Sequence, residues 1–221
     1  ESRYAWMDEG MAYFLPWDLQ IELSEYDHRT RAAIGFSKWA GNEMDIPLIL
    51  PSVLSRDPHL SMMSYYKPAL AYNMLESALG EELFAKGLKE FIARWNGKHP
   101  TPWDFFYTFE DVTKQDLNWF WNPWFFESHI PDLAIKDLKI ENDKIKILIE
   151  NVGNLPVPID LTLTLEDGTQ TNLHASTSIW EKGDKEIWLN VDVKSKVKSV
   201  ELLNKNIPDA DSNNNKLIVK D

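Results

Sequence analysis

The 221-residue chain contains no cysteine. Disulfide frameworks, thiolate zinc sites and cysteine nucleophiles are therefore excluded. Basic residues are also few, because 23 lysines and arginines stand against 35 aspartates and glutamates, which gives a net charge of −12. A binder of nucleic acid or of an anionic membrane needs a basic surface, so this balance argues against both. No apolar run approaches the roughly 20 residues that a transmembrane helix needs.

Histidine is sparse as well. The chain has five histidines, and the nearest two, His99 and His129, are 30 positions apart. No His-x-x-x-His pair is present, so no self-contained helical metal site with two histidine ligands can be identified. A glycine-rich phosphate loop and a Gly-x-Ser-x-Gly nucleophile elbow are also missing from the sequence.

Aromatic side chains are abundant, at 12% of the residues with ten tryptophans. All seven tyrosines, all ten phenylalanines and eight of the ten tryptophans precede Pro131. A change this sharp predicts a domain boundary near Ser128–Asp132, where the proline is a local breaker. We therefore expect one domain over residues 1–130 and a second over residues 131–221.

The first of these domains is predicted to be helical. Apolar residues at helical spacing predict helices over Ala5–Leu15, Tyr66–Leu79 and Glu81–Trp95. Thr101–Asp104 and Thr113–Asp116 have the composition of helix starts, with a threonine cap and an aspartate near the positive helix end. Residues 41–61 contain three prolines and are predicted to form a loop with short turns.

The second domain is predicted to consist of strands. Apolar residues alternate or run together over Ile145–Ile149, Ile159–Leu165, Glu186–Val193 and Lys198–Leu203. Asp167-Gly168 is typical of a hairpin turn. Six to seven short strands in about 90 residues predict a β-sandwich of immunoglobulin-like size, without the Cys–Trp–Cys core of true immunoglobulin domains.

An acidic run near the C-terminus, Asp209-Ala-Asp-Ser-Asn213, matches the opening of a calcium-binding loop. Its sixth position would be Asn214 rather than glycine, and its twelfth would be Lys220 rather than glutamate. We therefore interpret the run as a polar hairpin loop.

Glu9 is the remaining candidate for chemistry. It lies in the otherwise apolar stretch Trp6–Phe14, and a helical wheel places it near Trp6 and Tyr13. A carboxylate beside bulky aromatic rings is costly unless it is paired, hydrogen-bonded or bound to a metal. An exposed glutamate at a helix edge is the other interpretation.

The stretch Arg3-Tyr-Ala-Trp-Met-Asp-Glu-Gly10 resembles a segment of the M1-family (gluzincin) zinc metallopeptidases. In that family a His-Glu-x-x-His helix supplies two zinc ligands and the general base, and a glutamate in Trp-x-(Asn/Asp)-Glu-Gly supplies the third ligand. The resemblance places Glu9 at this third ligand position.

A second stretch, Ser64-Tyr-Tyr-Lys-Pro68, resembles the family's Tyr-x-Lys segment. The tyrosine of that segment donates a hydrogen bond to the oxyanion of the tetrahedral intermediate. The resemblance implies that Tyr65 has this role, with Tyr66 as the alternative, and that Lys67 is the family lysine. Many members have glycine after that lysine, and Pro68 departs from this pattern.

The resemblance covers nearly the whole chain and is densest over residues 1–126. It implies the helical C-terminal part of a thermolysin-like catalytic domain followed by an immunoglobulin-like β-sandwich. It also implies a zinc cofactor, a peptide substrate and hydrolysis by a zinc-activated water, with aminopeptidase activity favoured over endopeptidase activity.

The two histidine ligands are not in the chain. Counting back 19 positions from Glu9 puts the second of them before residue 1. We therefore expect the His-Glu-x-x-His helix, and the Gly-x-Met-Glu-Asn segment that binds the substrate amine, to lie outside this chain. Catalytic zinc takes three protein ligands, so we expect the isolated chain to be inactive and to bind zinc only weakly.

A non-catalytic module is the alternative function. In that case the helical scaffold and the sandwich would bind a protein or a glycan through an exposed aromatic surface. A gene that encodes His-Glu-x-x-His shortly upstream of Glu1 would favour the enzyme. Translation that begins near Glu1 would favour the module.

Overall fold

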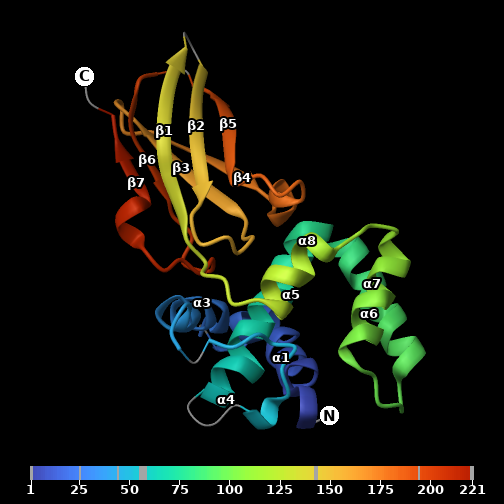
Figure 1. Cartoon of the computed structure of the whole chain (residues 1–221). Helices are drawn as coiled ribbons and strands as arrows, with labels where there is room; N and C mark the ends of the chain where they lie inside the picture. Colours follow the sequence, from blue (N-terminus) through green and yellow to red (C-terminus); the bar gives the residue numbers. More distant parts are fainter. Residues whose placement is uncertain are drawn as a thin grey trace.

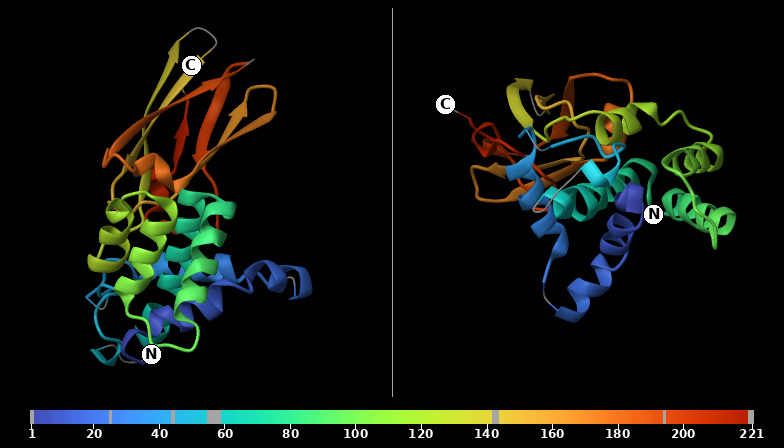
Figure 2. Two further views of the ribbon diagram at one scale, coloured as in Figure 1. Left: turned by 90° about the vertical axis from the view of Figure 1, so that its right-hand side faces the viewer. Right: turned by 60° about the horizontal axis from the view of Figure 1, so that its bottom comes forward.

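The computed structural model describes residues 2–24, 26–43, 45–54, 59–141, 144–193 and 195–219. Within these ranges the helices precede Glu127, apart from two short 3₁₀ turns, and the strands follow Pro131 (Figure 1). The helices occupy one end of the molecule and the strands the other, and Figure 2 shows the same division from two further directions.

The helical end contains twelve helices and helical turns in the described part of the chain. They are η1 (Ser2–Met7), α1 (Glu9–Phe14), α2 (Trp17–Ser24), α3 (His28–Trp39), η2 (Ser52–Leu54), α4 (His59–Ser61), η3 (Met62–Tyr66), α5 (Lys67–Leu79), α6 (Glu81–Trp95), α7 (Pro102–Thr113), α8 (Asn118–Trp121) and η4 (Asn122–Phe126). The turns η1 and η2 are 3₁₀-helical, whereas η3 and η4 are π-helical. Among the described residues, none of these helices has the length and apolar character needed to cross a membrane.

The helices after residue 66 follow the predictions closely. α5 starts one residue later than predicted and ends as predicted at Leu79, before Gly80, which has a positive φ of 79°. α6 has the predicted bounds. The amide of Thr101 donates to Asp104 Oδ2 at 2.8 Å, so the start predicted for α7 is confirmed.

The second predicted helix start is wrong. Thr113 is the last residue of α7, which closes at Lys114 with a φ of 59°. The next helix, α8, starts at Asn118, whose amide donates to Asp116 Oδ1 at 3.0 Å. The aspartate therefore lies beside the start of α8, and the threonine has no part in it.

The helix predicted over Ala5–Leu15 is confirmed in part, because its first turn is 3₁₀-helical and only Glu9–Phe14 is α-helical. The chain forms η1 and then α1, and Tyr4 inside η1 departs from helical geometry (φ −129°, ψ 64°). α3 was not predicted, because its apolar periodicity is weak. Asp27 is its cap and accepts hydrogen bonds from the amides of Arg29 and Thr30.

The strands form two antiparallel sheets, with the orders β1-β2-β5 and β4-β3-β6-β7. Their bounds are β1 (Leu133–Glu141), β2 (Lys144–Asn151), β3 (Ile159–Leu165), β4 (Gln170–Ala175), β5 (Glu186–Asp192), β6 (Val197–Leu202) and β7 (Lys216–Ile218). Buried and half-buried residues alternate strictly along β3, as the sequence predicts. Gly168, with a φ of 85°, forms the predicted turn between β3 and β4.

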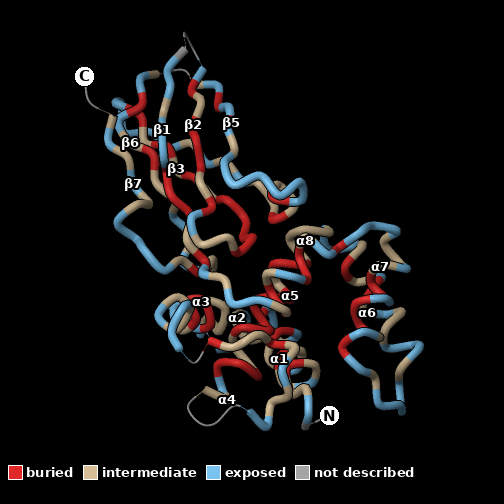
Figure 3. The backbone as a smooth tube through the Cα atoms, in the orientation of Figure 1, coloured by how far each residue is buried: buried red, intermediate tan, exposed pale blue. Residues whose placement is uncertain are grey.

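Aromatic side chains fill the core of the helical end, and Figure 3 shows where buried residues lie along its helices. The largest of those that are almost fully buried are Trp6, Phe36, Tyr72, Phe105, Phe109, Phe120, Trp121, Trp124 and Phe125. One tryptophan of this end bonds to the strand end, and a second tryptophan bonds within the strand end. Trp124 Nε1 donates to the carbonyl of Pro156 at 3.0 Å, and Trp180 Nε1 donates to the carbonyl of Val157 at 2.8 Å.

The acidic run near the C-terminus lies in the loop between β6 and β7. The amide of Asp209 donates to Ser37 Oγ in α3 at 2.8 Å, and its carboxylate accepts from the amide of Leu133 in β1 at 3.1 Å. The run is therefore a polar loop that joins the helical end to a strand. Lys220, at the twelfth position of the calcium pattern, lies outside the described residues.

Burial raises the pKa of Asp209 to about 6, and the charge of Asp132 adds to the rise. Hydrogen bonds from the amides of Leu133 and Asp211 and from the Asn215 side chain oppose it. Because the pKa is higher in the folded state, ionisation of this carboxyl destabilises the fold. The protonated Asp209 carboxyl therefore stabilises the fold. This stabilisation is fully present at pH values below the unfolded-state pKa, and it is lost as the pH rises through about 6.

We predict that Asp209→Asn gains stability relative to the wild type as the pH rises from 4 to 7. The relative gain should be about 1–2 kcal/mol, after allowance for solvent screening. Urea unfolding at both pH values measures it, and a constant offset from altered hydrogen bonds does not affect the comparison. Ser37→Ala removes the acceptor of the Asp209 amide without removing a titrating group, so its effect should be equal at both pH values. A stability difference for Asp209→Asn that does not change with pH would refute the prediction.

Candidate functional site

The candidate site lies where α1 packs against the start of α5. Gly10 is buried there, and a Cβ at this position would lie 2.7 Å from Pro68 Cβ and 3.4 Å from the carbonyl oxygen of Ser64. A real Cβ does not approach another carbon this closely, so only glycine allows the contact. The glycine of the Glu-Gly stretch and the proline of the Tyr-Tyr-Lys-Pro stretch are therefore packing partners.

This contact brings the two predicted site residues together. Glu9 is the first residue of α1 and is half-buried, and Tyr65 is half-buried in η3. The Tyr65 hydroxyl faces the Glu9 carboxylate, and hydrogen-bonding interaction with that carboxylate is the main reason why the pKa of Tyr65 is raised. Burial and the negative charges of Glu9 and Asp8 raise that pKa further. The hydroxyl is thus held protonated, as a hydrogen-bond donor that faces a carboxylate.

Tyr66 packs in a different environment. Its ring lies 5.4 Å from the Tyr13 ring between centroids, and the Arg31 guanidinium carbon lies 5.9 Å from its centroid. A Cβ on Gly35 of α3 would lie 3.1 Å from Tyr66 Cδ2. Tyr66 therefore fills the space between α1 and α3, whereas Tyr65 faces Glu9.

The π-helical geometry of η3 accompanies this separation of the two tyrosines. Met62–Tyr66 forms a single π-helical turn that leads directly into α5. Such turns occur inside longer helices and are frequent at functional sites. The turn was not predicted, because nothing in the local sequence distinguishes it from an α-helical turn.

The family lysine is part of a buried ion pair. Lys67 Nζ lies 2.7 Å from Asp45 Oδ1, and the two side chains are 0% and 2% exposed. The other oxygen, Asp45 Oδ2, accepts from the amide of Gly41 at 3.1 Å. Asp45 was missed in the sequence, because it stands in the proline-containing loop 41–61 and no spacing rule links it to Lys67.

Trp6 anchors the segment that precedes Glu9. It is 2% exposed, and its ring centroid lies 4.8 Å from that of Phe125 and 6.0 Å from that of Phe106. The Tyr72 hydroxyl of α5 donates to the carbonyl of Trp6 at 3.3 Å. The tryptophan of the Trp-x-x-Glu-Gly pattern thus has a packing role.

A second polar pair, which the sequence did not indicate, lies close to the site. The Tyr13 hydroxyl is 3.2 Å from His28 Nδ1, and the Tyr13 ring lies edge-on to Tyr65 with centroids 6.3 Å apart. Burial raises the pKa of Tyr13 well above its usual value, and the neighbouring Tyr66 adds to the rise. Tyr13 separates the Glu9–Tyr65 contact from the histidine.

Glu9 is the sole candidate zinc ligand that the sequence analysis identified. Across the described ranges, no three His, Asp or Glu side chains come together in a group that could hold a metal ion. Catalytic zinc takes three protein ligands and a water. The described residues therefore do not form a zinc site by themselves.

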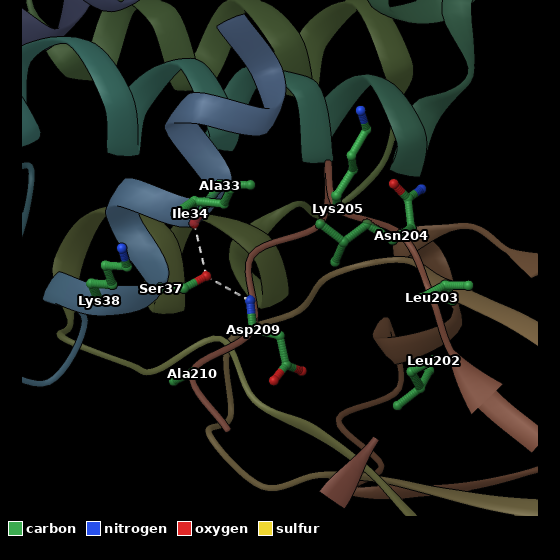
Figure 4. Close-up of a pocket in the computed structure, with 11 residues that line it drawn as sticks. Ala33, Ile34, Ser37, Lys38, Leu202, Leu203, Asn204, Lys205, Asp209 and Ala210 are labelled. Carbon is green, nitrogen blue, oxygen red and sulfur yellow. Dashed lines mark hydrogen bonds between the residues drawn. The ribbon is translucent and has the colours of Figure 1, made fainter. Parts of the chain in front are cut away.

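The structure also contains a groove that is separate from these residues (Figure 4). It has a volume of about 410 Å³ and lies between α3 and residues 202–210, with Ile34, Leu203 and Asp209 among its lining residues. Neither Glu9 nor Tyr65 lines it. Its position at the junction of helices and strands relates it to the polar loop and not to the Glu9–Tyr65 contact.

We predict that Gly10→Ala destabilises the chain by about 1–3 kcal/mol through overpacking against Pro68. Helix propensity alone would give the opposite sign, because alanine is favoured over glycine by about 1 kcal/mol in a helix. Urea denaturation followed by circular dichroism measures the change. Adding Pro68→Ala, which removes the Cγ that lies 2.8 Å from the new Cβ, should recover part of the loss. A stabilised Gly10→Ala variant would show that the contact is not tight.

Comparison with known proteins identifies the family. The profile of the Peptidase family M1 domain matches residues 3–124. The match includes the whole candidate site, from Glu9 to Lys67. It ends within η4, so it covers the helical end of the molecule.

Three characterised relatives are aminopeptidases. Aminopeptidase N of Haemophilus influenzae is 34% identical over 94 residues, which cover 42% of this chain and 11% of that protein. Aminopeptidase N of Escherichia coli K12 is 30% identical over 137 residues, which cover 59% of this chain and 16% of that protein. Aminopeptidase M1-A of Oryza sativa subsp. japonica is 22% identical over 213 residues, which cover 86% of this chain and 24% of that protein.

A solved structure has a similar fold. The crystal structure of Legionella pneumophila aminopeptidase A in complex with aspartic acid has a TM-score of 0.62, with 20% sequence identity. The likeness covers 93% of this chain and 23% of that chain. The chain thus spans less than a quarter of the length of each of these proteins. Because the family profile covers 122 of the 221 residues, the chain belongs to peptidase family M1.

Proposed function

We propose that Glu9 is a zinc ligand and that Tyr65 is the oxyanion-stabilising donor of an M1-family zinc aminopeptidase. The interaction between these two side chains carries the proposal, because it joins the residues that two separate sequence patterns indicate. Membership of family M1 supports it independently. The names of the Haemophilus and Escherichia relatives support an aminopeptidase over an endopeptidase.

In this proposal Tyr65 acts as a neutral hydrogen-bond donor. A tyrosine hydroxyl has an ordinary pKa of about 10, so it is protonated at neutral pH and its proton is available to an oxyanion. A donor that is held in place before the charge develops stabilises the transition state without reorganisation. Zinc, when bound by Glu9 and by two histidines from outside residues 1–221, would lower the pKa of its water and polarise the peptide carbonyl.

We further propose that the division of the molecule corresponds to two domains. Residues 1–130 would be the helical C-terminal part of a thermolysin-like catalytic domain, and residues 131–221 an immunoglobulin-like β-sandwich. The change from helices to strands between Phe126 and Leu133 supports this division. Two antiparallel sheets of three and four strands support the second part.

A non-catalytic module that binds a protein or glycan is the second candidate function. The observation in its favour is that α7 exposes Trp103 and Tyr107, one turn apart, by 46% and 63%. Exposed aromatic side chains of this kind are typical of recognition surfaces. Protein or glycan binding that is lost in Trp103→Ala/Tyr107→Ala would favour the module, provided that residues 3–124 give no activity when they replace the matching segment of an active aminopeptidase.

A chimeric enzyme tests the catalytic proposal. Residues 3–124 would replace the matching segment of Escherichia coli aminopeptidase N, and the kinetics of the active chimera would be measured. We expect Tyr65→Phe to lower kcat about 10²–10³-fold, the usual effect of losing one oxyanion donor. Tyr66→Phe is the matched control and should leave kcat little changed. The opposite result, with the loss at Tyr66→Phe, would assign the role to the other tyrosine.

Zinc titration of the isolated chain tests the role of Glu9 separately. One carboxylate ligand is too few for catalytic zinc, so we predict binding that is weaker than micromolar and no aminopeptidase activity. Isothermal titration calorimetry with zinc alone measures the affinity, and Glu9→Ala is the control. Tight binding that Glu9→Ala abolishes would show that the chain holds a complete site.

A further inference from the structure

We propose that the buried Lys67–Asp45 ion pair is the positioning device of Tyr65. The pair sets the rotation of the backbone at the start of α5, so that Tyr65 projects toward Glu9. The inference rests on the proposed function only for the catalytic meaning of Tyr65. The positioning is itself a property of the fold and can be tested without activity.

The ion pair lies in the interior of the helical end. The 2.7 Å contact between Lys67 Nζ and Asp45 Oδ1 is almost completely shielded from solvent. The ammonium group also lies 5.5 Å from the centroid of the Phe36 ring, which belongs to α3. Burial lowers the pKa of Lys67, and the Asp45 carboxylate opposes that change. The lysine side chain thus has a defined position instead of the usual freedom of a surface lysine.

Lys67 and Tyr65 point to opposite sides of the same helical segment. Residues two positions apart lie on roughly opposite sides of a helix, and the wider π-helical turn η3 changes the exact angle without changing this relation. A restraint on the interior side therefore determines the direction of the side chain on the other side. Tyr65 is half-buried and contacts Glu9, whereas Lys67 is fully buried.

Asp45 is itself attached to the far end of the helical region. Its carbonyl accepts from Ser128 Oγ at 2.6 Å, and nearby the amide of Ile49 donates to the carbonyl of Phe125 at 2.9 Å. Gly41 donates its amide to Asp45 Oδ2. The loop that carries Asp45 is thus held by hydrogen bonds on both sides of the ion pair, and it provides a fixed reference for α5.

The energetics of buried ion pairs favour a positioning role. Removing two charges from water is costly, and well-packed apolar side chains often give equal or greater stability. An ion pair, however, demands a specific direction and distance, which an apolar contact does not. The contact of Pro68 with Gly10 restrains the same segment from the side of α1, next to Glu9. Two contacts thus determine where Tyr65 lies.

The double variant Asp45→Asn/Lys67→Met tests the inference. Asparagine keeps an acceptor for the amide of Gly41, and methionine fills the space of the lysine stem, so no charge is left unpaired. The readout is the NOE between the Tyr65 and Tyr13 rings in the tyrosine-labelled chain, where the centroids lie 6.3 Å apart. We expect this cross-peak to be lost in the double variant while the chain remains folded.

Two further variants make the result decisive. Arg94→Met/Asp111→Asn removes a solvent-exposed pair between α6 and α7 by the same chemistry, and it should leave the cross-peak unchanged. Asp45→Asn alone is milder, because the buried lysine can lose its proton, and it should weaken the cross-peak. If the double variant does not fold, the intensity of the Tyr65–Tyr13 cross-peak in Asp45→Asn alone tests the inference.

An undiminished cross-peak in every folded variant of Asp45 and Lys67 would overturn the inference. Failure of the proposed function would look different. In that case Tyr65→Phe would leave the kcat of the chimera unchanged, while the loss of the NOE in the double variant would persist.

Discussion

The close approach of α1 to the start of α5 is the contact on which the candidate site depends. Gly10 lies against Pro68 at a distance that leaves no room for a Cβ, and its neighbour Glu9 is thereby brought to Tyr65, which precedes Pro68 by three residues. A single contact between two helices thus places both proposed functional side chains. The aromatic core behind it resists deformation because it is densely packed, so the distance between the helices is well defined.

The fold could be predicted best where local signals were strong. α6 has a pronounced apolar face and glycines beyond both ends, and β3 alternates strictly, so both were predicted with the observed bounds. Residues 2–40 were predicted poorly, because buried and exposed positions there follow from packing against α5 and the aromatic core rather than from a regular period. α3 is an example: a cap at Asp27 starts it, and its tertiary contacts determine which face is buried.

The candidate site was predicted in part. Glu9 and Tyr65 could be named from the resemblance to family M1, with Tyr66 as the alternative, because adjacent residues on a helix differ only in direction. The packing of Tyr66 against Tyr13 and Gly35 supplies that direction. Asp45 could not be predicted, because its relation to Lys67 spans 22 positions and exists only in the folded chain.

The central claim is that the packing of α1 on α5 joins Glu9 to Tyr65 and not to Tyr66. A double-mutant cycle on the free energy of unfolding tests it most directly, with Glu9→Gln, Tyr65→Phe and the double variant, and a parallel cycle with Tyr66→Phe. The account predicts a coupling energy between Glu9 and Tyr65 of at least about 0.5 kcal/mol, as found for residues in contact, and a value near zero for Glu9 and Tyr66. Coupling of Glu9 to Tyr66, or no coupling to either tyrosine, would contradict it.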